Sequence, residues 1–200
     1  SEKVFSMKRL LLIVILTFSF QSWTKADDIS DFQIEGLSIG DSLLDYFSRD
    51  EIEKVPKTWY PSKEYYMINL PNNNNHTFET VGVSLKNNDK KYLLKSIGGQ
   101  IFYKTNINDC YTKKNEIVNE LSEIFKNITE KEIAGKVILN SDKTGKSFAE
   151  TVNFLFDNGA LISVQCKDWS EALDYWDRLK VSLVSKEYYE FTQFRAFKNN

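Results

Sequence analysis

Histidine and cysteine are scarce in this chain, and their scarcity limits the chemistry available to it. The sequence contains one histidine, His76, and two cysteines, Cys110 and Cys166, which are far apart. Zinc sites are built from closely spaced Cys and His ligands, usually three or four of them. A His-Glu-x-x-His motif is absent from the sequence as well. We therefore expect no metal and no cofactor, and we assign no catalytic residue.

Ser42 is the one serine whose neighbours suggest a nucleophile. The run Gly40-Asp41-Ser42-Leu43 spells the signature of the GDSL esterases, which pair this serine with a histidine base near the C-terminus. The single histidine, His76, lies far from the C-terminus, in an Asn-rich loop. A serine before Leu43-Leu44 is also an ordinary helix cap. Capping is therefore the expected role of Ser42, and an unorthodox hydrolase is kept as an alternative.

A second motif resembles a phosphate-binding P-loop. Residues 140–147 end in Gly145-Lys146-Ser147, as that loop requires, but Asn140 stands in place of its first glycine. The residues that follow, 151–156, alternate like a strand, whereas the P-loop is followed by a helix. We expect a polar turn here and no nucleotide site.

Aromatic side chains are the feature that most favours binding. Two segments, 59–66 and 188–194, are dense in Trp, Tyr and Phe. Tyr and Trp are common at interfaces because they combine a large apolar area with a polar group. The candidate binding residues are Trp59, Tyr60, Tyr188 and Tyr189. The alternative is that these rings fill the core of the domain.

The elements that would position these residues follow from the hydrophobic pattern. Alternation of apolar and polar residues predicts a series of strands. The turn residues Asp157-Asn158-Gly159 predict a hairpin, and Gly98-Gly99 predicts a bulge or bend. The expected strands cover residues 65–70, 78–86, 92–103, 136–139, 148–156, 160–166 and, as a short one, 181–184.

Helical periodicity is clearest over residues 109–127, where one apolar stripe runs along the segment. Shorter helices are expected over 41–48, 50–55 and 186–197, and Asp168 with Glu171 fits a capping box that would open another. Strands and helices do not alternate regularly. The sequence therefore predicts an α+β fold, a mostly antiparallel sheet with helices packed on one face, as a single domain over 27–200.

The first 26 residues have the order of a secretory signal peptide. Lys8 and Arg9 precede the apolar run Leu10–Phe20, and Thr24-Lys25-Ala26 offers a small-residue cleavage site, with Met7 as the expected start. The run has 11 residues, whereas a membrane-spanning helix needs about 20. We expect cleavage, no stable membrane anchor, and a periplasmic or extracellular protein.

Export to an oxidising compartment favours a disulfide bond between the two cysteines. Two cysteines in an oxidising compartment most simply form a disulfide, so Cys110 and Cys166 are expected to pair. That bond would fasten the main helix to the end of a hairpin strand. Two buried free thiols are the alternative.

The net charge of the chain limits the kind of partner that it can bind. The chain has 26 Lys and Arg against 28 Asp and Glu, and loss of the basic leader makes the rest more acidic. Nucleic-acid binding requires a basic face, so nucleic acid is not an expected partner.

Two segments carry a resemblance. Residues 31–44 and 157–169 resemble uncharacterised exported proteins of marine alphaproteobacteria. The opening Gly36-Leu37-Ser38-Ile39-Gly40 is similar, more loosely, to small envelope-assembly domains of the BamE type, although the chain lacks their lipid-anchoring Cys. The resemblance implies export and assigns no activity.

These observations predict a soluble, exported, non-enzymatic binding or protein-interaction module. Its partner would be an envelope protein or a small ligand, whose identity the sequence does not give. The alternatives are an envelope hydrolase that uses Ser42 and a structural envelope protein.

Overall fold

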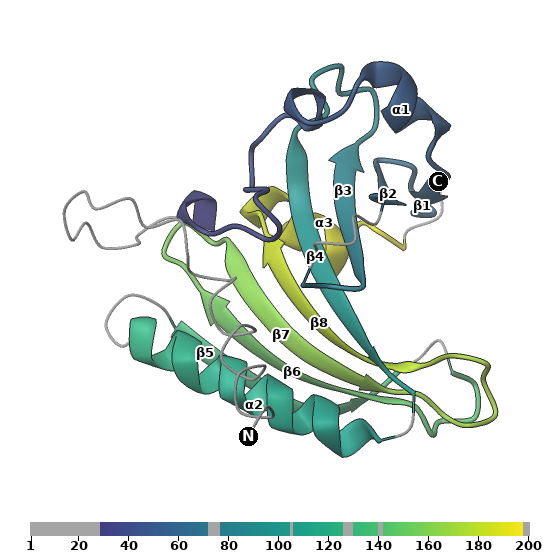
Figure 1. Cartoon of the computed structure of the whole chain (residues 1–200), viewed down its shortest axis with the longest axis vertical. Coiled ribbons are helices and arrows are strands. Elements are labelled where there is room, and N and C mark those ends of the chain that lie inside the picture. Colours follow the sequence, from purple (N-terminus) through teal and green to yellow (C-terminus); the bar gives the residue numbers. More distant parts are fainter. Residues whose placement is uncertain (1–28, 72–76, 105, 126–129, 140–141, 198–200) are drawn as a thin grey trace, which may run out of the picture.

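Alternating apolar and polar residues build eight strands, which pair into one antiparallel sheet (Figure 1). The computed structural model describes residues 29–71, 77–104, 106–125, 130–139 and 142–197. The strand order is β1-β2-β3-β4-β8-β7-β6-β5. The strands are β1 (Thr58–Trp59), β2 (Tyr65–Asn69), β3 (Thr80–Lys86), β4 (Leu94–Tyr103), β5 (Glu130–Ile138), β6 (Phe148–Leu155), β7 (Leu161–Asp168) and β8 (Asp177–Val184).

Helices occupy the connections and the chain end. The α-helices are α1 (Arg49–Lys54), α2 (Ile107–Ile124) and α3 (Lys186–Phe194), and two short 3-10 turns are η1 (Ile29–Asp31) and η2 (Leu43–Asp45). The α+β class holds, although the sheet dominates. Within the described ranges, no helix is long and apolar enough to cross a membrane. The expected signal peptide, 1–26, lies outside the described residues.

The face of the sheet that α2 covers is apolar. Buried strand residues such as Ile97, Val164 and Val181 form one core with Val118 and Leu121 of α2. The first described residues belong to this core as well, and the Phe32 ring packs against those of Phe125 and Phe156. Most of the buried apolar surface therefore lies between the sheet and the elements on this side.

Three bonds fasten α2 to the strands below it. Cys110, in the first turn of the helix, forms a disulfide with Cys166 of β7, and their Cα atoms are 6.0 Å apart. Lys114, nearly buried, forms an ion pair with Glu150 of β6 at 2.7 Å. The Tyr111 hydroxyl donates to Asp168 at 3.2 Å. The expected pairing of the two cysteines is present, which fits an oxidising compartment.

α3 lies on the opposite face, whereas we expected all helices on one face. Tyr65 and Tyr66 are neighbours in β2, so their side chains point to opposite faces. Tyr66 belongs to the main core, while Tyr65 packs with Tyr188 and Phe191 of α3. The Glu187 carboxylate accepts from Lys86 at 2.6 Å and from Tyr65 at 2.8 Å. α3 therefore has its own small aromatic cluster on the far side of the sheet.

The helix expected from Asp168 onward is absent, and that prediction was wrong. β7 runs to Asp168, which pairs with Phe148, and residues 169–176 form a loop to β8. Trp169 N donates to Asp177 Oδ1 at 2.7 Å, and Ser170 N donates to Ser147 Oγ at 2.9 Å. The N–H groups that would begin a helix are thus bound to groups in and beside the sheet.

Candidate functional site

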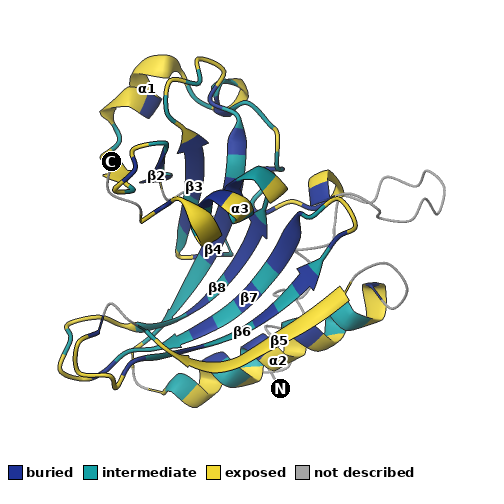
Figure 2. Cartoon of the chain, turned by 180° about the vertical axis from the view of Figure 1, so that it is seen from behind, coloured by how far each residue is buried: buried dark blue, intermediate teal, exposed yellow. Residues whose placement is uncertain are grey.

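α3 covers only one end of its face of the sheet. Figure 2 shows this face, with α3 crossing the ends of β4 and β8, while no described helix covers β6 and β7 on this side. A cavity of about 500 Å³ lies here, and side chains of the sheet, the β1 region and α3 line it. The candidate site is this pocket on the side of the sheet away from α2.

The floor of the pocket is polar because every second residue of its strands is polar. In β8, Arg178, Lys180 and Ser182 line the pocket, and the residues between them face the core. Lys180 pairs with Gln100 of β4 and with Gln165 of β7. The next row of paired residues on this face, two positions further along each strand, also presents hydroxyl and amide groups. That row contains Ser182, Ser163 of β7 and Asn153 of β6.

Two paired glycines leave space on the floor of the pocket, and the Lys180 side chain lies in that space. Gly82 of β3 and Gly98 of β4 are opposite each other. A Cβ atom at Gly98 would be 2.6 Å from Lys180 Cε and 3.1 Å from Ser182 Oγ. The Lys180 side chain therefore lies across Gly98, where no other residue would leave room for it.

Three cations are neighbours on this floor. Lys167 of β7 pairs directly with Arg178 of β8, and Lys180 is two residues further along the same face. Burial, together with the charges of Lys180 and Arg178, lowers the pKa of Lys167 to about 8. Burial followed by the charge of Arg178 lowers the pKa of Lys180 as well. Among the described residues, those that line the pocket include these three cations and no acidic side chain.

Aromatic residues of α3 and the β1 region form a wall of the pocket. Tyr60, Tyr188 and Tyr189, three of the four candidate binding aromatics, line it. The hydroxyls of Tyr60 and Tyr188 are 2.6 Å apart. Burial is the largest cause of the raised pKa of Tyr188. The fourth candidate, Trp59, lies outside the lining, with its ring 4.8 Å from that of Tyr66.

No protein family, curated protein or solved structure matches this chain. The assignment of a site therefore depends on the geometry of the pocket.

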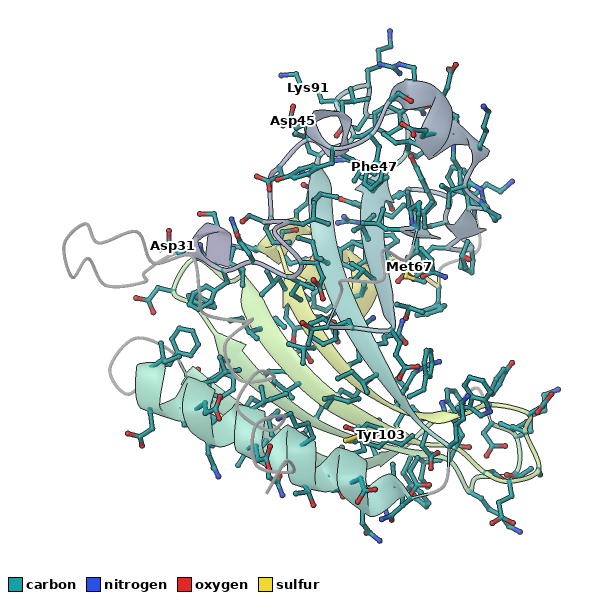
Figure 3. The ribbon with its side chains drawn as sticks, in the orientation of Figure 1. Asp31, Asp45, Phe47, Met67, Lys91 and Tyr103 are labelled. Atoms are coloured by element: carbon teal, nitrogen blue, oxygen red, sulfur yellow. A yellow bond between two sulfur atoms is a disulfide. The ribbon has the colours of Figure 1, made fainter. Side chains whose placement is uncertain are left out.

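Ser42 takes the capping role expected for it. Its hydroxyl donates to Lys91 O at 2.7 Å and accepts from Leu44 N at 3.2 Å, so it caps η2. Lys91 lies at the end of the molecule opposite Tyr103 (Figure 3). Ser42 is not among the residues that line the pocket. His76, the single histidine of the chain, which the sequence places too far from the C-terminus to be the usual base, lies outside the described residues.

The P-loop-like segment forms a turn where it is described. The Asp142 carboxylate accepts from Thr144 N at 2.8 Å and from Ser147 N at 3.0 Å. β6 begins directly afterwards, so a strand follows the turn, as expected. Residues 140 and 141 lie outside the described residues. In the part of the chain that the structure describes, no group of three His, Cys, Asp or Glu residues could hold a metal ion.

Sequence reasoning did not identify the cationic residues of the floor. The signal was present, because Ser163, Gln165 and Lys167 alternate with core residues, as do Arg178 and Lys180. Alternation of this kind equally describes a sheet face turned to solvent. The sheet partners and the position of α3, which the pattern does not contain, turn this face into a pocket.

The lowered pKa of Lys167 predicts that stability rises from pH 8 to about pH 10. Unfolded lysine titrates near 10.4, so in this window the unfolded chain binds more protons than the native protein. Urea midpoints measured at pH 7.5, 8.5 and 9.5 should therefore increase. The window ends near pH 10, where buried tyrosines such as Tyr188, whose pKa values are raised, reverse the slope.

The variant Lys167→Gln should make this rise smaller, and the lowered pKa of Lys180 accounts for a further part of it. The groups that act on the Lys167 ammonium are Lys180, Arg178 and the Trp169 ring, which is 6.0 Å away. Lys143→Gln, at an exposed lysine outside the pocket, is the matched control and should behave as the wild type. A wild-type midpoint that is flat over this pH range would contradict the prediction.

Proposed function

We propose that this chain is an exported, non-enzymatic binding module that holds a small polar ligand in the pocket between α3 and the open face of the sheet. The observation that carries the proposal is the pocket itself. Its volume of about 500 Å³ lies in the range of about 300–1,000 Å³ that is usual for small-molecule sites. Side chains from several strands converge on it.

The polarity of the floor supports this function over a merely structural one. A sheet face that only packs against another element is apolar, as it is under α2. The pocket face instead presents Ser163, Ser182, Gln165 and other polar groups toward a hollow space. Few of these groups are bonded to each other, and the bond from Gln165 Nε2 to Thr151 Oγ1, at 2.7 Å, is one that is made. Their remaining donors and acceptors are suited to a polar molecule.

The bonds that hold the helices to the sheet support the same function. A bond between Cys110 and Cys166 fixes α2 to the back of the sheet that forms the floor. A floor braced in this way keeps its shape before the ligand arrives, which reduces the entropic cost of binding. The Glu187 contacts hold α3 to the other side of the pocket in a similar manner.

Ligand-detected NMR with a library of small polar compounds tests the proposal. We expect compounds that bind to the wild-type protein and fail to bind to Ser163→Phe, since the phenyl ring would fill the centre of the floor. Asn108→Phe adds the same ring at an exposed position in the first turn of α2 and should bind as the wild type does. Near-UV circular dichroism checks that both variants are folded. Hits that are equally strong with Ser163→Phe, or a library without any hit, would overturn the proposal.

A further inference from the structure

The end of the pocket near β7 and β8 concentrates positive charge. Lys167 and Arg178 are directly opposite each other across the two strands, and Lys180 follows on the same face. Paired residues of antiparallel strands have Cβ atoms about 5 Å apart. Three cationic side chains therefore start from one small area of the floor.

Within the described residues, no acidic side chain forms an ion pair with these three cations. Asp168 and Asp177 are adjacent in sequence to Lys167 and Arg178, but strand alternation directs them to the other face. Asp168 accepts there from Tyr111, and Asp177 accepts from Trp169 N. None of the described residues that line the pocket is acidic. The Trp169 ring, 5.4 Å from the Arg178 guanidinium, provides only a cation–π contact.

Other donors at this end are also without a partner. Arg178 Nε is buried and makes no hydrogen bond within the described residues. Within the described residues the Lys180 ammonium makes no ion pair and no hydrogen bond, and Gly98 leaves the space in which its side chain lies. Partly buried cations that repel one another, with donors unused, are unfavourable unless an anion joins them.

We infer that the ligand is a hydroxyl-bearing organic anion whose charged group, a carboxylate or a phosphate, is bound by Lys167, Arg178 and Lys180. The inference rests on the proposed binding function and names the chemistry of the ligand. Arginine binds both kinds of oxyanion through two parallel N–H bonds, and lysine adds a point charge. Beyond the cations, Ser182, Ser163 and Gln165 offer hydroxyl and amide groups to a hydroxylated body.

Isothermal titration with three matched sugars tests the inference. Glucose is neutral, glucuronate carries a carboxylate and glucose 6-phosphate carries a phosphate. At pH 7 and low salt, at least one of the two anions should bind about tenfold or more tightly than glucose, because charge-assisted hydrogen bonds are the stronger ones. The anion that binds more tightly identifies the charged group. Equal binding of all three sugars, or tighter binding of glucose, would overturn the inference.

Variants then locate the anion. Lys180→Gln should weaken binding of the preferred anion by about tenfold and leave glucose unaffected. Gly98→Ala keeps the lysine but places a Cβ 2.6 Å from its Cε, so it should weaken anion binding too. Lys143→Gln removes an equal charge at an exposed site and should bind as the wild type does. Anion binding that is unchanged in both pocket variants would contradict the inference.

A second readout needs no ligand. If the three cations repel one another, Lys180→Gln should raise the thermal unfolding temperature of the free protein, while Lys143→Gln should leave it unchanged. A lower unfolding temperature for Lys180→Gln would mean that the ammonium stabilises the fold. Repulsion among the cations would then no longer support a bound anion, and the inference would be contradicted.

Failure of this inference and failure of the proposed function give different results. Glucose that binds as well as both anions, and is lost in Ser163→Phe, leaves the binding function standing and overturns the anion. If none of the three sugars binds at about 10 mM, the anion inference fails. The broader library with Ser163→Phe then decides on the binding function separately.

Discussion

Reduction of the disulfide between Cys110 and Cys166 should lower the free energy of unfolding by about 4 kcal/mol. The two residues are separated by 56 positions, so the bond removes much conformational freedom from the unfolded chain. It also joins α2 to β7, which are otherwise held together by side-chain packing and by the hydrogen bond from Tyr111 to Asp168, while Lys114 binds Glu150 of the neighbouring β6. Urea unfolding of the oxidised and the reduced protein, at equal pH, measures the difference.

Three controls make this result specific. The double variant Cys110→Ser/Cys166→Ser should unfold with the reduced wild type, not with the oxidised protein. The oxidised protein in denaturant should show no titratable thiol, since both cysteines are in the bond. Hydrogen exchange should increase first in the opening turn of α2, while the β7–β8 ladder stays protected. Equal urea midpoints for the oxidised and reduced protein would contradict the prediction.

The strands and the main helix could be predicted because their pattern is local. Strict alternation places Val81, Val83 and Leu85 on one face of β3, and burial of that face is enough to fix the element. The hairpin at Asp157-Asn158-Gly159 is confirmed by the pairing of Leu155 with Leu161, and Gly159 adopts a φ of +83° that favours glycine. The bounds of β5 were less predictable, as its residues are exposed throughout.

Elements that depend on tertiary contacts were predicted less well. A capping box at Asp168 and Glu171 is a valid local signal, but the pairing of Asp168 with Phe148 extends β7 instead. The face on which α3 lies follows from Tyr65, whose partners in space are far away in sequence. Contacts between residues so far apart in sequence leave no periodic pattern in a single sequence, so they cannot be predicted from it.

The candidate site was predicted in part, for the same reason. Tyr60, Tyr188 and Tyr189 stood out by density and do line the pocket, whereas Lys167, Arg178 and Lys180 did not stand out. Lysine and arginine are common on exposed strand faces, so composition gives no reason to select three of them. Their importance comes from being neighbours without an acid, and only the strand register shows this.

The sequence predicts a bulge or bend at Gly98-Gly99 of β4, and no bulge is found at these two residues. Gly98 and Gly99 pair regularly with Gly82 and Val81, and the irregularity of the β3–β4 ladder lies at Ser84/Leu85. Each glycine instead makes room on one face of the sheet. Gly98 lies beneath Lys180 in the pocket, and Gly99 lies beneath the ring of Phe78 in the core.

Gly99→Ala should therefore destabilise the protein by about 2–3 kcal/mol. A Cβ atom at Gly99 would be 2.3 Å from Phe78 Cγ and 2.5 Å from its Cδ2, closer than atoms can approach. Phe78 is buried, and its backbone N–H donates to Glu35 Oε1 at 3.1 Å, so the ring has little freedom to retreat. Urea unfolding of the variant measures the loss.

The neighbouring glycine provides the matched control for this prediction. Gly98→Ala makes the same change in the same strand, but its Cβ meets the flexible end of Lys180, so it should cost less than about 1 kcal/mol. A double-mutant cycle with Phe78→Ala isolates the contact. Without the ring, Gly99→Ala should cost close to nothing, because the added methyl group then fills part of the vacated space. If the cost of Gly99→Ala is the same with and without Phe78, the glycine is needed for the backbone of β4 and not for the ring above it.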